Sequence, residues 1–186
     1  MIFRAVEDAD LISRVRRGDV EGFNHLVSRW EKRVFNYLLR LTGSQEDAMD
    51  LSQEAFLKAY QNIRKLDDPA RFGPWLYRIA HNEAHSLFRK RRPETALEEA
   101  PPERNAAPGF SMDLSLAVTA ALDRLNPDQR EAVVLKVYEG FKFEEMAEIL
   151  ECPVSTVKSR LYTALDLLKS ELAPVSARGK FNDSSK

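Results

Sequence analysis

Apolar residues recur at helical spacing in two adjacent segments between residues 143 and 169. The first segment is short, with apolar positions at Met146, Ala147, Ile149 and Leu150. The second has apolar positions at Val154, Val157, Leu161, Ala164, Leu165 and Leu168. The intervening Glu151-Cys152-Pro153 is long enough only for a turn. The second segment turns polar side chains outward, namely Ser155, Thr156, Lys158, Ser159, Arg160, Tyr162 and Thr163. The pattern therefore predicts a helix-turn-helix whose second helix can enter a major groove.

The same periodicity predicts four helices in the first half of the chain. A short helix over Asp10–Arg17 ends near Gly18, and a long apolar stripe from Val20 to Leu41 ends at Thr42-Gly43. Ser44 and Asp47 resemble a capping box at the start of the third helix. That helix turns inward Ala48, Leu51, Ala55, Ala59 and Ile63. The fourth follows Pro69 and carries Phe72, Trp75, Leu76, Ile79, Ala80, Leu87 and Phe88. Strand-like alternation is absent from the sequence, so the predicted fold class is all-α.

A proline-rich segment divides the predicted helices into two groups. Residues 93–112 hold four prolines among Glu and Ala, without an apolar period, which predicts a flexible linker. The helical pattern resumes at Leu114, and Asn126-Pro127 predicts an N-cap followed by proline at the first helical position. Residues 173–186, rich in Ser, Gly and Lys, predict a disordered tail. We therefore expect two small helical domains, over residues 8–92 and 113–172.

Composition excludes several classes of protein. The 186 residues are 44% hydrophobic, but no apolar run approaches the roughly 20 residues that a membrane-spanning helix needs, so we expect no membrane insertion. The N-terminus is too acidic for a signal peptide. The single cysteine, Cys152, cannot form an internal disulfide, which favours a reducing, cytoplasmic location.

Charge is distributed unevenly, although the net charge is only −1. Residues 1–92 carry 17 Lys and Arg against 13 Asp and Glu, whereas residues 113–172 carry 7 against 11. The two predicted domains therefore differ in sign, at +4 and −4. These charges leave open both separate domains and a salt-sensitive, autoinhibitory contact between them, and the sequence does not decide between the two. The basic excess is densest at Arg89-Lys90-Arg91-Arg92, the end of an aromatic-rich helix.

Candidate catalytic and metal-binding groups are sparse. The sequence shows no nucleophile–base set and no phosphate-cradling glycine loop, so we expect a protein that is not an enzyme and needs no cofactor. His81 and His85 lie four residues apart, which is a spacing found in metal sites. Asn-Glu-Ala separates them and no third ligand is visible in the sequence, so we expect no metal site.

Four segments, in this order and at this spacing, resemble the extracytoplasmic-function (ECF) sigma factors of the sigma-seventy family. They are DAMDLSQEAFLKAYQNI, RFGPWLYRIAHNEAHSLFRKRR, LNPDQREAVVLKVYEGFKFEEMAEIL and CPVSTVKSRLYTALDLLK. The resemblance extends from about Asp8 to Leu172. It implies sigma domain two, a linker and sigma domain four, in a subunit that directs core RNA polymerase to specific promoters and helps melt the minus-ten element. It also implies an anti-sigma factor as a further partner.

The resemblance assigns the third helix to core polymerase. The helix matching Asp47–Ile63 docks on the clamp helices of the largest subunit in that family, while the beta-subunit flap is a second expected contact. The implied residues are Asp47, Asp50, Gln53, Glu54, Phe56, Leu57, Lys58 and Tyr60. A polar rim around aromatic anchors suits a protein interface. An ordinary solvated helix face is the alternative from the residues alone.

The resemblance assigns residues 66–92 to the melted minus-ten element. Its base-capturing loop matches Asp67–Pro74, and Asn82 matches an asparagine whose amide contacts non-template bases. The implied set is Asp68, Arg71, Phe72, Arg78, Asn82, His85, Arg89, Lys90, Arg91 and Arg92. Phe72, Trp75 and Ile79 are also expected as core residues.

The resemblance assigns the outward face of the helix-turn-helix to the minus-thirty-five element. The implied residues are Ser155, Thr156, Lys158, Ser159, Arg160, Tyr162 and Thr163. Glu151 stands where the family commonly has glycine, and Thr163 and Leu165 stand where basic residues are frequent. With the domain also at −4, we expect weak duplex binding unless polymerase tethers the domain.

A stand-alone helix-turn-helix regulator is the alternative function. Response-regulator effector domains end in a similar helix, but residues 1–92 lack the alternation of strand and helix that a receiver domain shows. Tight duplex binding without polymerase would favour this alternative.

Overall fold

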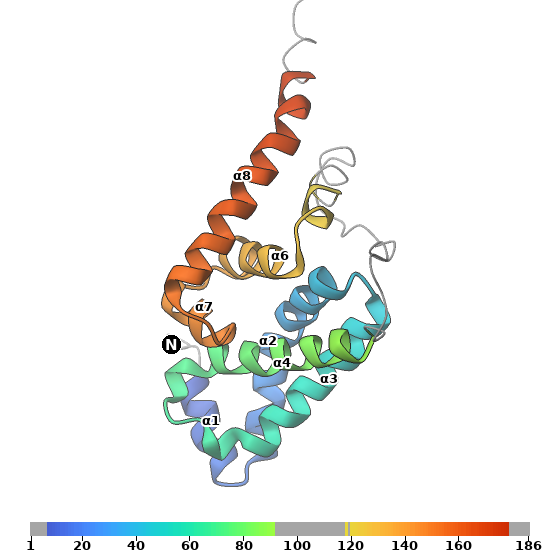
Figure 1. The fold of residues 1–186 in the computed structure, drawn as a ribbon. Coiled ribbons are helices and arrows are strands. Elements are labelled where there is room, and N and C mark those ends of the chain that lie inside the picture. The colour runs from blue at the N-terminus through green and yellow to red at the C-terminus, as the bar shows by residue number, and fades with distance from the viewer. Residues whose placement is uncertain (1–6, 92–117, 119, 179–186) are drawn as a thin grey trace, which may run out of the picture.

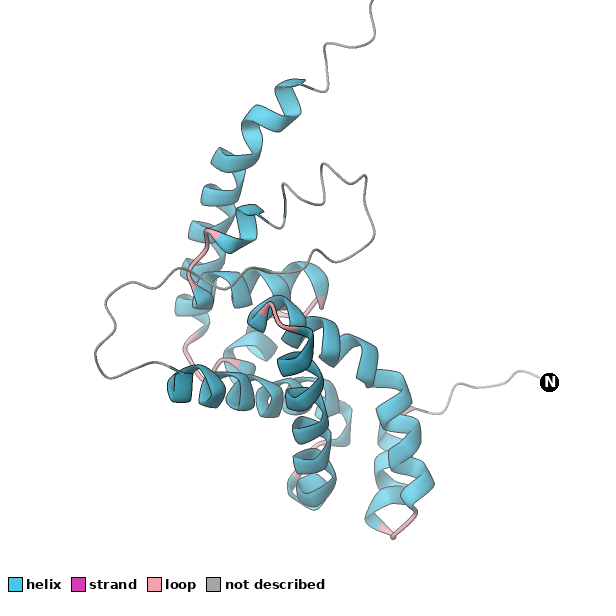
Figure 2. Cartoon of the chain, turned by 90° about the vertical axis from the view of Figure 1, so that its right-hand side faces the viewer, coloured by secondary structure: helices cyan, strands magenta, loops and turns pink. Residues whose placement is uncertain are grey.

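The computed structural model describes residues 7–91, 118 and 120–178, and these residues contain helices and turns but no strand (Figure 2). The predicted all-α fold class is confirmed. The expected linker, residues 93–112, lies outside the described residues. Within the part of the chain that the structure describes, no helix is long and apolar enough to cross a membrane.

The N-terminal domain consists of four helices, α1 (Asp8–Arg16), α2 (Val20–Thr42), α3 (Gln45–Asn62) and α4 (Phe72–Arg91). Two single-turn 3-10 helices, η1 (Ile63–Lys65) and η2 (Pro69–Arg71), connect α3 to α4. The inward positions predicted for the third helix are all buried. They pack against residues of α2 and α4, including Leu26, Val34, Leu38, Leu76 and Ala80.

The ends of these helices follow from local chemistry. The Asp19 carboxylate accepts hydrogen bonds from the amides of Glu21 and Gly22 at the start of α2. Gly43 ends α2 with φ 70°, in the left-handed region that favours glycine. The Ser44 hydroxyl then accepts from the Asp47 amide, which confirms the predicted cap of α3.

The C-terminal domain begins with a helical turn at 120–123 and continues with α6 (Pro127–Val133), η3 (Val134–Tyr138), α7 (Phe143–Ile149) and α8 (Val154–Arg178). η3 is a π-helical stretch that continues α6. Asn126 caps the start of α6 and Pro127 follows it, as the sequence predicts, and Gln129 completes a capping box with Asn126. The turn between α7 and α8 holds Glu151 at φ 49°, a conformation in which glycine would be unstrained.

Helix α8 is longer than the sequence indicates. It continues to Arg178 and so includes residues 173–178, which the sequence assigned to a disordered tail. Adding a residue other than proline to an existing helix gains one backbone hydrogen bond, so a weak local sequence can extend a helix that is already nucleated, although Pro174 in this segment has no N–H to donate. In Figure 1, α8 begins beside α7 and runs away from the rest of the molecule.

The two domains pack directly on each other. α7 lies against α4, and α6 with η3 lies against α2 (Figure 1). Phe141 of the C-terminal domain packs edge-on against Tyr77 of α4, with ring centroids 4.8 Å apart, and Tyr77 in turn lies 4.9 Å from the Tyr37 ring of α2. The buried apolar residues of both domains therefore form one continuous core.

Candidate nucleic-acid interface

One face of α4 presents polar and basic side chains to solvent. Arg78, Asn82 and Arg89 are exposed and recur at helical spacing, and Lys90 is exposed beside them. These four members of the predicted minus-ten set lie together on one surface. An exposed amide flanked by guanidinium groups can pair with a base edge while the cations contact phosphates.

Several other members of the minus-ten set are occupied by protein contacts. Asp68 caps η2 by accepting from the Ala70 amide at 2.9 Å. Arg71 forms an ion pair of 2.6 Å with Glu148 of α7, and His85 contacts Glu131 of α6. Arg92 lies outside the described residues. In this conformation the C-terminal domain thus engages part of the expected DNA surface.

Phe72 is a core residue in this structure. It is 1% exposed and packs edge-on against Trp30, with ring centroids 6.1 Å apart. Its place in the DNA-binding set stays a prediction, whereas the core role expected beside it is confirmed in this conformation. The first turn of α4 faces inward because Phe72 and Leu76 follow the inward stripe of the helix.

The helix-turn-helix presents the predicted polar face. Ser155, Lys158, Ser159 and Thr163 are exposed at the start of α8, and Tyr162 is 56% exposed. Thr156 is partly buried. This face lies opposite the buried residues Val157, Leu161 and Ala164, so the predicted amphipathic pattern is confirmed at these positions, whereas Leu165 of the apolar set is 39% exposed.

Neighbouring groups restrain two residues of this face. The Arg160 guanidinium pairs with Asp128 of α6 at 2.6 Å, and the Lys158 ammonium lies 5.2 Å from the Phe143 ring centroid. Arg160 also approaches the Cys152 sulfur at 3.8 Å. Burial raises the pKa of the Cys152 thiol, which disfavours the thiolate form.

The predicted polymerase-docking face on α3 is largely accessible. Asp50 and Gln53 are exposed, and Leu57 and Tyr60 are 50% and 41% exposed. These two apolar side chains are accessible to a partner that binds α3. Phe56, by contrast, is 8% exposed and lines a groove of about 550 Å³ between α2 and α3, together with Val27, Phe35 and Met49.

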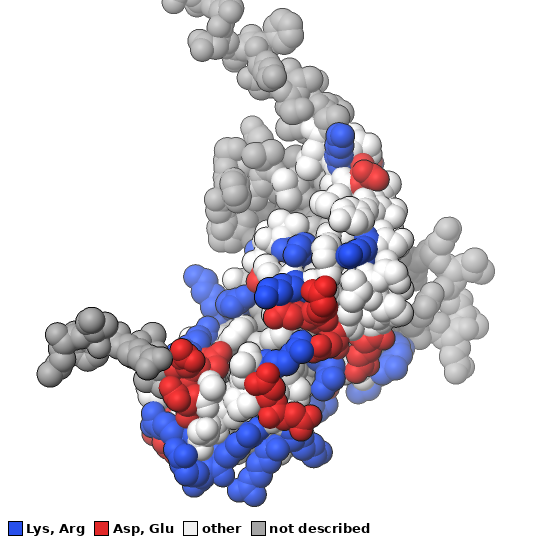
Figure 3. All heavy atoms as spheres, turned by 90° about the vertical axis from the view of Figure 1, so that its left-hand side faces the viewer, with Lys and Arg blue, Asp and Glu red and all other residues white. Residues whose placement is uncertain are grey.

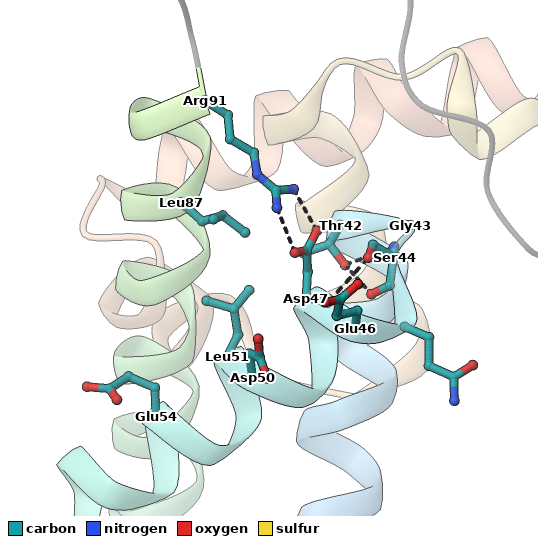
Figure 4. Close-up of a pocket in the computed structure, with 11 residues that line it drawn as sticks. Thr42, Gly43, Ser44, Glu46, Asp47, Asp50, Leu51, Glu54, Leu87 and Arg91 are labelled. Carbon is teal, nitrogen blue, oxygen red and sulfur yellow. Dashed lines mark hydrogen bonds and ion pairs between the residues drawn. The ribbon is translucent and has the colours of Figure 1, made fainter.

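The ends of this face are held by ion pairs to α4. The Lys58 ammonium lies 2.6 Å from the carboxylate of Glu83 on α4. It also lies 3.5 Å from Glu54, which is on α3 itself. Figure 4 shows Arg91 reaching from the end of α4 to Asp47 in a two-pronged contact, over a pocket of about 830 Å³. The hydrogen bond from Arg91 lowers the pKa of Asp47. The expected polymerase and DNA surfaces therefore meet at this pocket.

A buried carboxylate lies where the domains meet. Glu131 of α6 is 2% exposed and accepts a hydrogen bond from the Tyr37 hydroxyl of α2. His81 Nδ1 lies 2.7 Å from one of its oxygens, and His85 Nε2 lies 3.1 Å from the other. Burial alone would raise the pKa of Glu131, but its contacts with the two histidines lower it below 4.5. Hydrogen bonding to Glu131 in turn raises the pKa of His85.

Two more glutamates of the C-terminal domain contact the N-terminal domain. Glu139, whose side chain is 5% exposed, lies 3.2 Å from the Arg33 guanidinium and accepts from the Tyr77 hydroxyl at 2.6 Å. Glu148 makes the exposed pair with Arg71. On the face drawn in Figure 3, basic side chains line the lower edge and acidic ones gather above them. Ion pairs of opposite charge therefore join the two domains in this structure.

The sequence alone did not single out Glu131 or Glu139. Helical periodicity places Glu131 at an inward position directly before the buried run Ala132–Leu135. A carboxylate at such a position is a signal for a buried partner, because burying an unpaired charge is costly. No third ligand was visible in the sequence beside His81 and His85, which argued against a metal site. In the structure Glu131 lies next to both histidines, so that argument does not hold.

Comparisons with known proteins agree with this arrangement. Residues 26–94 match the Sigma-70 region 2 family model, and residues 115–168 match the Sigma-70, region 4 model. The RNA polymerase sigma-H factor of Pseudomonas aeruginosa is 32% identical over 187 residues, covering 91% of this chain and 95% of that protein. The ECF RNA polymerase sigma-E factor of Haemophilus influenzae is 34% identical over 185 residues, covering 90% and 96%. The chain therefore belongs to the sigma-70 family of sigma factors, and within it to the ECF group.

Solved structures give the same result. CnrH in complex with the cytosolic domain of CnrY is similar with a TM-score of 0.69 and 26% identity, over 90% of this chain and 97% of that one. The sigma factor RpoE of Bartonella quintana, in complex with the anti-sigma factor NepR, is similar with a TM-score of 0.69 and 28% identity, over 81% and 96%.

Proposed function

We propose that this chain is a promoter-specificity subunit that binds core RNA polymerase, brings it to specific promoters and helps melt the minus-ten element. The observation that carries the proposal is the pairing of two exposed nucleic-acid faces, on α4 and α8, with an accessible docking face on α3. The chain itself supplies recognition and melting, while the polymerase supplies the chemistry. It acts in the cytoplasm, where core polymerase is found.

Domain two, residues 8–92, would bind the melted minus-ten strand. The exposed group of Arg78, Asn82 and Arg89 can hold an unstacked base against a basic surface. The docking face of α3 lies on the adjacent helix, and the Asp47–Arg91 contact joins the two surfaces. Binding of polymerase at α3 would therefore place α4 beside the opened strand.

Domain four, residues 113–172, would bind the minus-thirty-five element as a duplex. The exposed cation Lys158 can donate to guanine acceptors or to phosphate. The three interdomain glutamates and the domain charge of −4 reduce its electrostatic attraction to DNA. The beta-subunit flap of the polymerase would hold this domain in place and raise its effective concentration at the promoter.

The packed arrangement is the closed, inactive form of the subunit. Elements centred near minus-ten and minus-thirty-five are separated by about 25 base pairs, or roughly 85 Å along B-DNA at 3.4 Å per pair. In the structure α4 and α7 are in direct contact. In this arrangement the DNA-binding faces of α4 and α8 cannot reach the minus-ten and minus-thirty-five elements at the same time. The domains must therefore separate when the polymerase binds.

An anti-sigma factor would control this opening. CnrH and RpoE, the similar solved structures, are in complex with CnrY and with the anti-sigma factor NepR, respectively. A partner of that kind would cover the α3 face or hold the two domains together. Either mode lowers the population of chain that is free to bind polymerase.

Run-off transcription with purified core polymerase tests the proposal. On a promoter library, the wild-type chain should direct transcription that core alone does not give, and Asn82→Ala should reduce it about tenfold, in line with 1–3 kcal/mol for a base contact. Asn24→Ala is the matched control, because Asn24 is exposed on α2 and bonds only Glu21. If the chain never raises transcription above core alone, the proposal fails.

A further inference from the structure

Two histidines and a carboxylate from different domains converge on one point. Nitrogen atoms of His81 and His85, on α4, and an oxygen of Glu131, on α6, all lie within 4.8 Å of one another. The imidazole rings face each other with centroids 4.1 Å apart. Two imidazoles and one carboxylate form a donor set that zinc uses in proteins, with a fourth position left for water.

From this geometry we infer that His81, His85 and Glu131 form a binding site for a divalent transition-metal ion that holds the two domains together. Imidazole with carboxylate suits zinc and its neighbours among the divalent metals, and zinc is the natural probe.

The distances are close to those a tetrahedral ion needs. Bonds of about 2.1 Å to zinc place neighbouring ligand atoms roughly 3.4 Å apart. One Glu131 oxygen now lies 2.7 Å from His81 Nδ1 and the other lies 3.1 Å from His85 Nε2, so binding of an ion would lengthen these contacts by about 0.3–0.7 Å. Ligand atoms that are farther apart, up to the 4.8 Å limit of the set, would have to move closer together. Side-chain rotation supplies such a change without moving a helix.

The surroundings also suit a metal ion. The Tyr37 hydroxyl donates to the carboxylate, as outer partners of metal ligands commonly do, and would fix its orientation. The His85 side chain is 34% exposed, which gives an ion a path from solvent, whereas the Glu131 side chain is 2% exposed. Metal binding would neutralise the negative charge of this buried carboxylate.

The location of the ligands links metal binding to domain closure. Two ligands belong to the N-terminal domain and one to the C-terminal domain, so an ion that uses all three binds only the packed arrangement. A ligand that binds one of two states stabilises that state. The bound metal would therefore keep the chain closed, and its loss would favour opening.

Calorimetric titration with zinc tests the site in the full-length chain. A Cys152→Ser background removes the only thiol, and His25, the remaining histidine, is exposed on α2 and supplies the matched control. One zinc should bind per chain. His85→Gln and Glu131→Gln should each weaken binding at least about tenfold, while His25→Gln should leave it unchanged. Equal affinity of His85→Gln and wild type overturns the proposal.

A second variant separates an interdomain site from one formed by the α4 histidines alone. Arg33→Ala removes the contact with Glu139 and loosens the interface without touching a ligand. Because linkage is reciprocal, this variant should bind zinc more weakly than wild type. Cobalt provides an independent readout, because a cobalt ion bound in tetrahedral geometry absorbs visible light strongly. The wild-type chain with cobalt should therefore show this absorption. Unchanged zinc affinity in Arg33→Ala, or cobalt absorption that survives Glu131→Gln, contradicts a site shared between domains.

Discussion

Replacing Glu131 by glutamine tests how strongly one buried carboxylate holds the domains together. Glutamine has nearly the same shape and keeps one acceptor oxygen for the Tyr37 hydroxyl. It removes the negative charge, however, and places an amide donor where His85 now meets an oxygen. Glu131 lies in the domain interface. We therefore expect the substitution to weaken the closed arrangement of the two domains relative to the open one, rather than to destabilise the fold of the C-terminal domain.

The magnitude follows from the contacts. Hydrogen bonds to a charged partner contribute about 1.5–3 kcal/mol, and Glu131 at 2% exposure has little water to replace them. At 1.4 kcal/mol per factor of ten, the closed-to-open ratio should fall roughly 10- to 150-fold. The remaining contacts of Glu139 and Arg33 keep the closed form populated in part.

Single-molecule energy transfer measures that ratio directly. Dyes attached at Arg64→Cys and Lys169→Cys, in a Cys152→Ser background with chelator present, report the separation of the domains from two exposed positions. Glu144→Gln is the matched control, because Glu144 is exposed on α7 and its change alters net charge equally. If Glu131→Gln leaves the distribution of separations identical to that of Glu144→Gln, the interface does not depend on the buried carboxylate, and the reasoning is refuted.

Three further predictions concern the fold and the interface. Glu151→Gly should stabilise the C-terminal domain by about 1 kcal/mol in thermal unfolding, because a φ of 49° strains any residue that carries a side chain. Glu151→Ala should not stabilise it, and equal effects of the two substitutions would contradict the argument. Gly73→Ala should destabilise the N-terminal domain by about 1–3 kcal/mol, because its added carbon would lie 2.6 Å from a Trp30 ring atom. Trp30→Phe should recover part of that loss, and additive effects in the double variant would count against a direct clash. Raising salt from low to high should expand the chain in solution scattering by screening pairs such as Arg33–Glu139 and Arg71–Glu148, and unchanged dimensions would argue against their role.

The helices and their ends could be predicted because they depend on local chemistry. The inward stripe of α3, the Ser44 cap and the Asn126-Pro127 start of α6 each follow from residues within one or two turns. The length of α8 could not, since its last turns depend on a helix already formed rather than on strong local signals.

The candidate site was predictable only in part, because the interface joins residues that are distant in sequence. Asn82 and Lys158 are exposed, as their helical positions predict. Glu131 and His81 are 50 residues apart, and no periodicity indicates that they meet. Opposite domain charges left a contact open, but they could not decide whether it forms or identify which of the acidic side chains would be buried in it.

Sequencing the DNA retained by the purified chain, alone and bound to core polymerase, tests the central claim most directly. A promoter-specificity subunit with a closed free form should enrich little specific DNA alone. Together with core polymerase it should enrich a two-part motif whose blocks are about 25 base pairs apart, roughly 85 Å along B-DNA. A chain that enriches one duplex motif equally well without polymerase would instead be a stand-alone regulator, and the account would be contradicted.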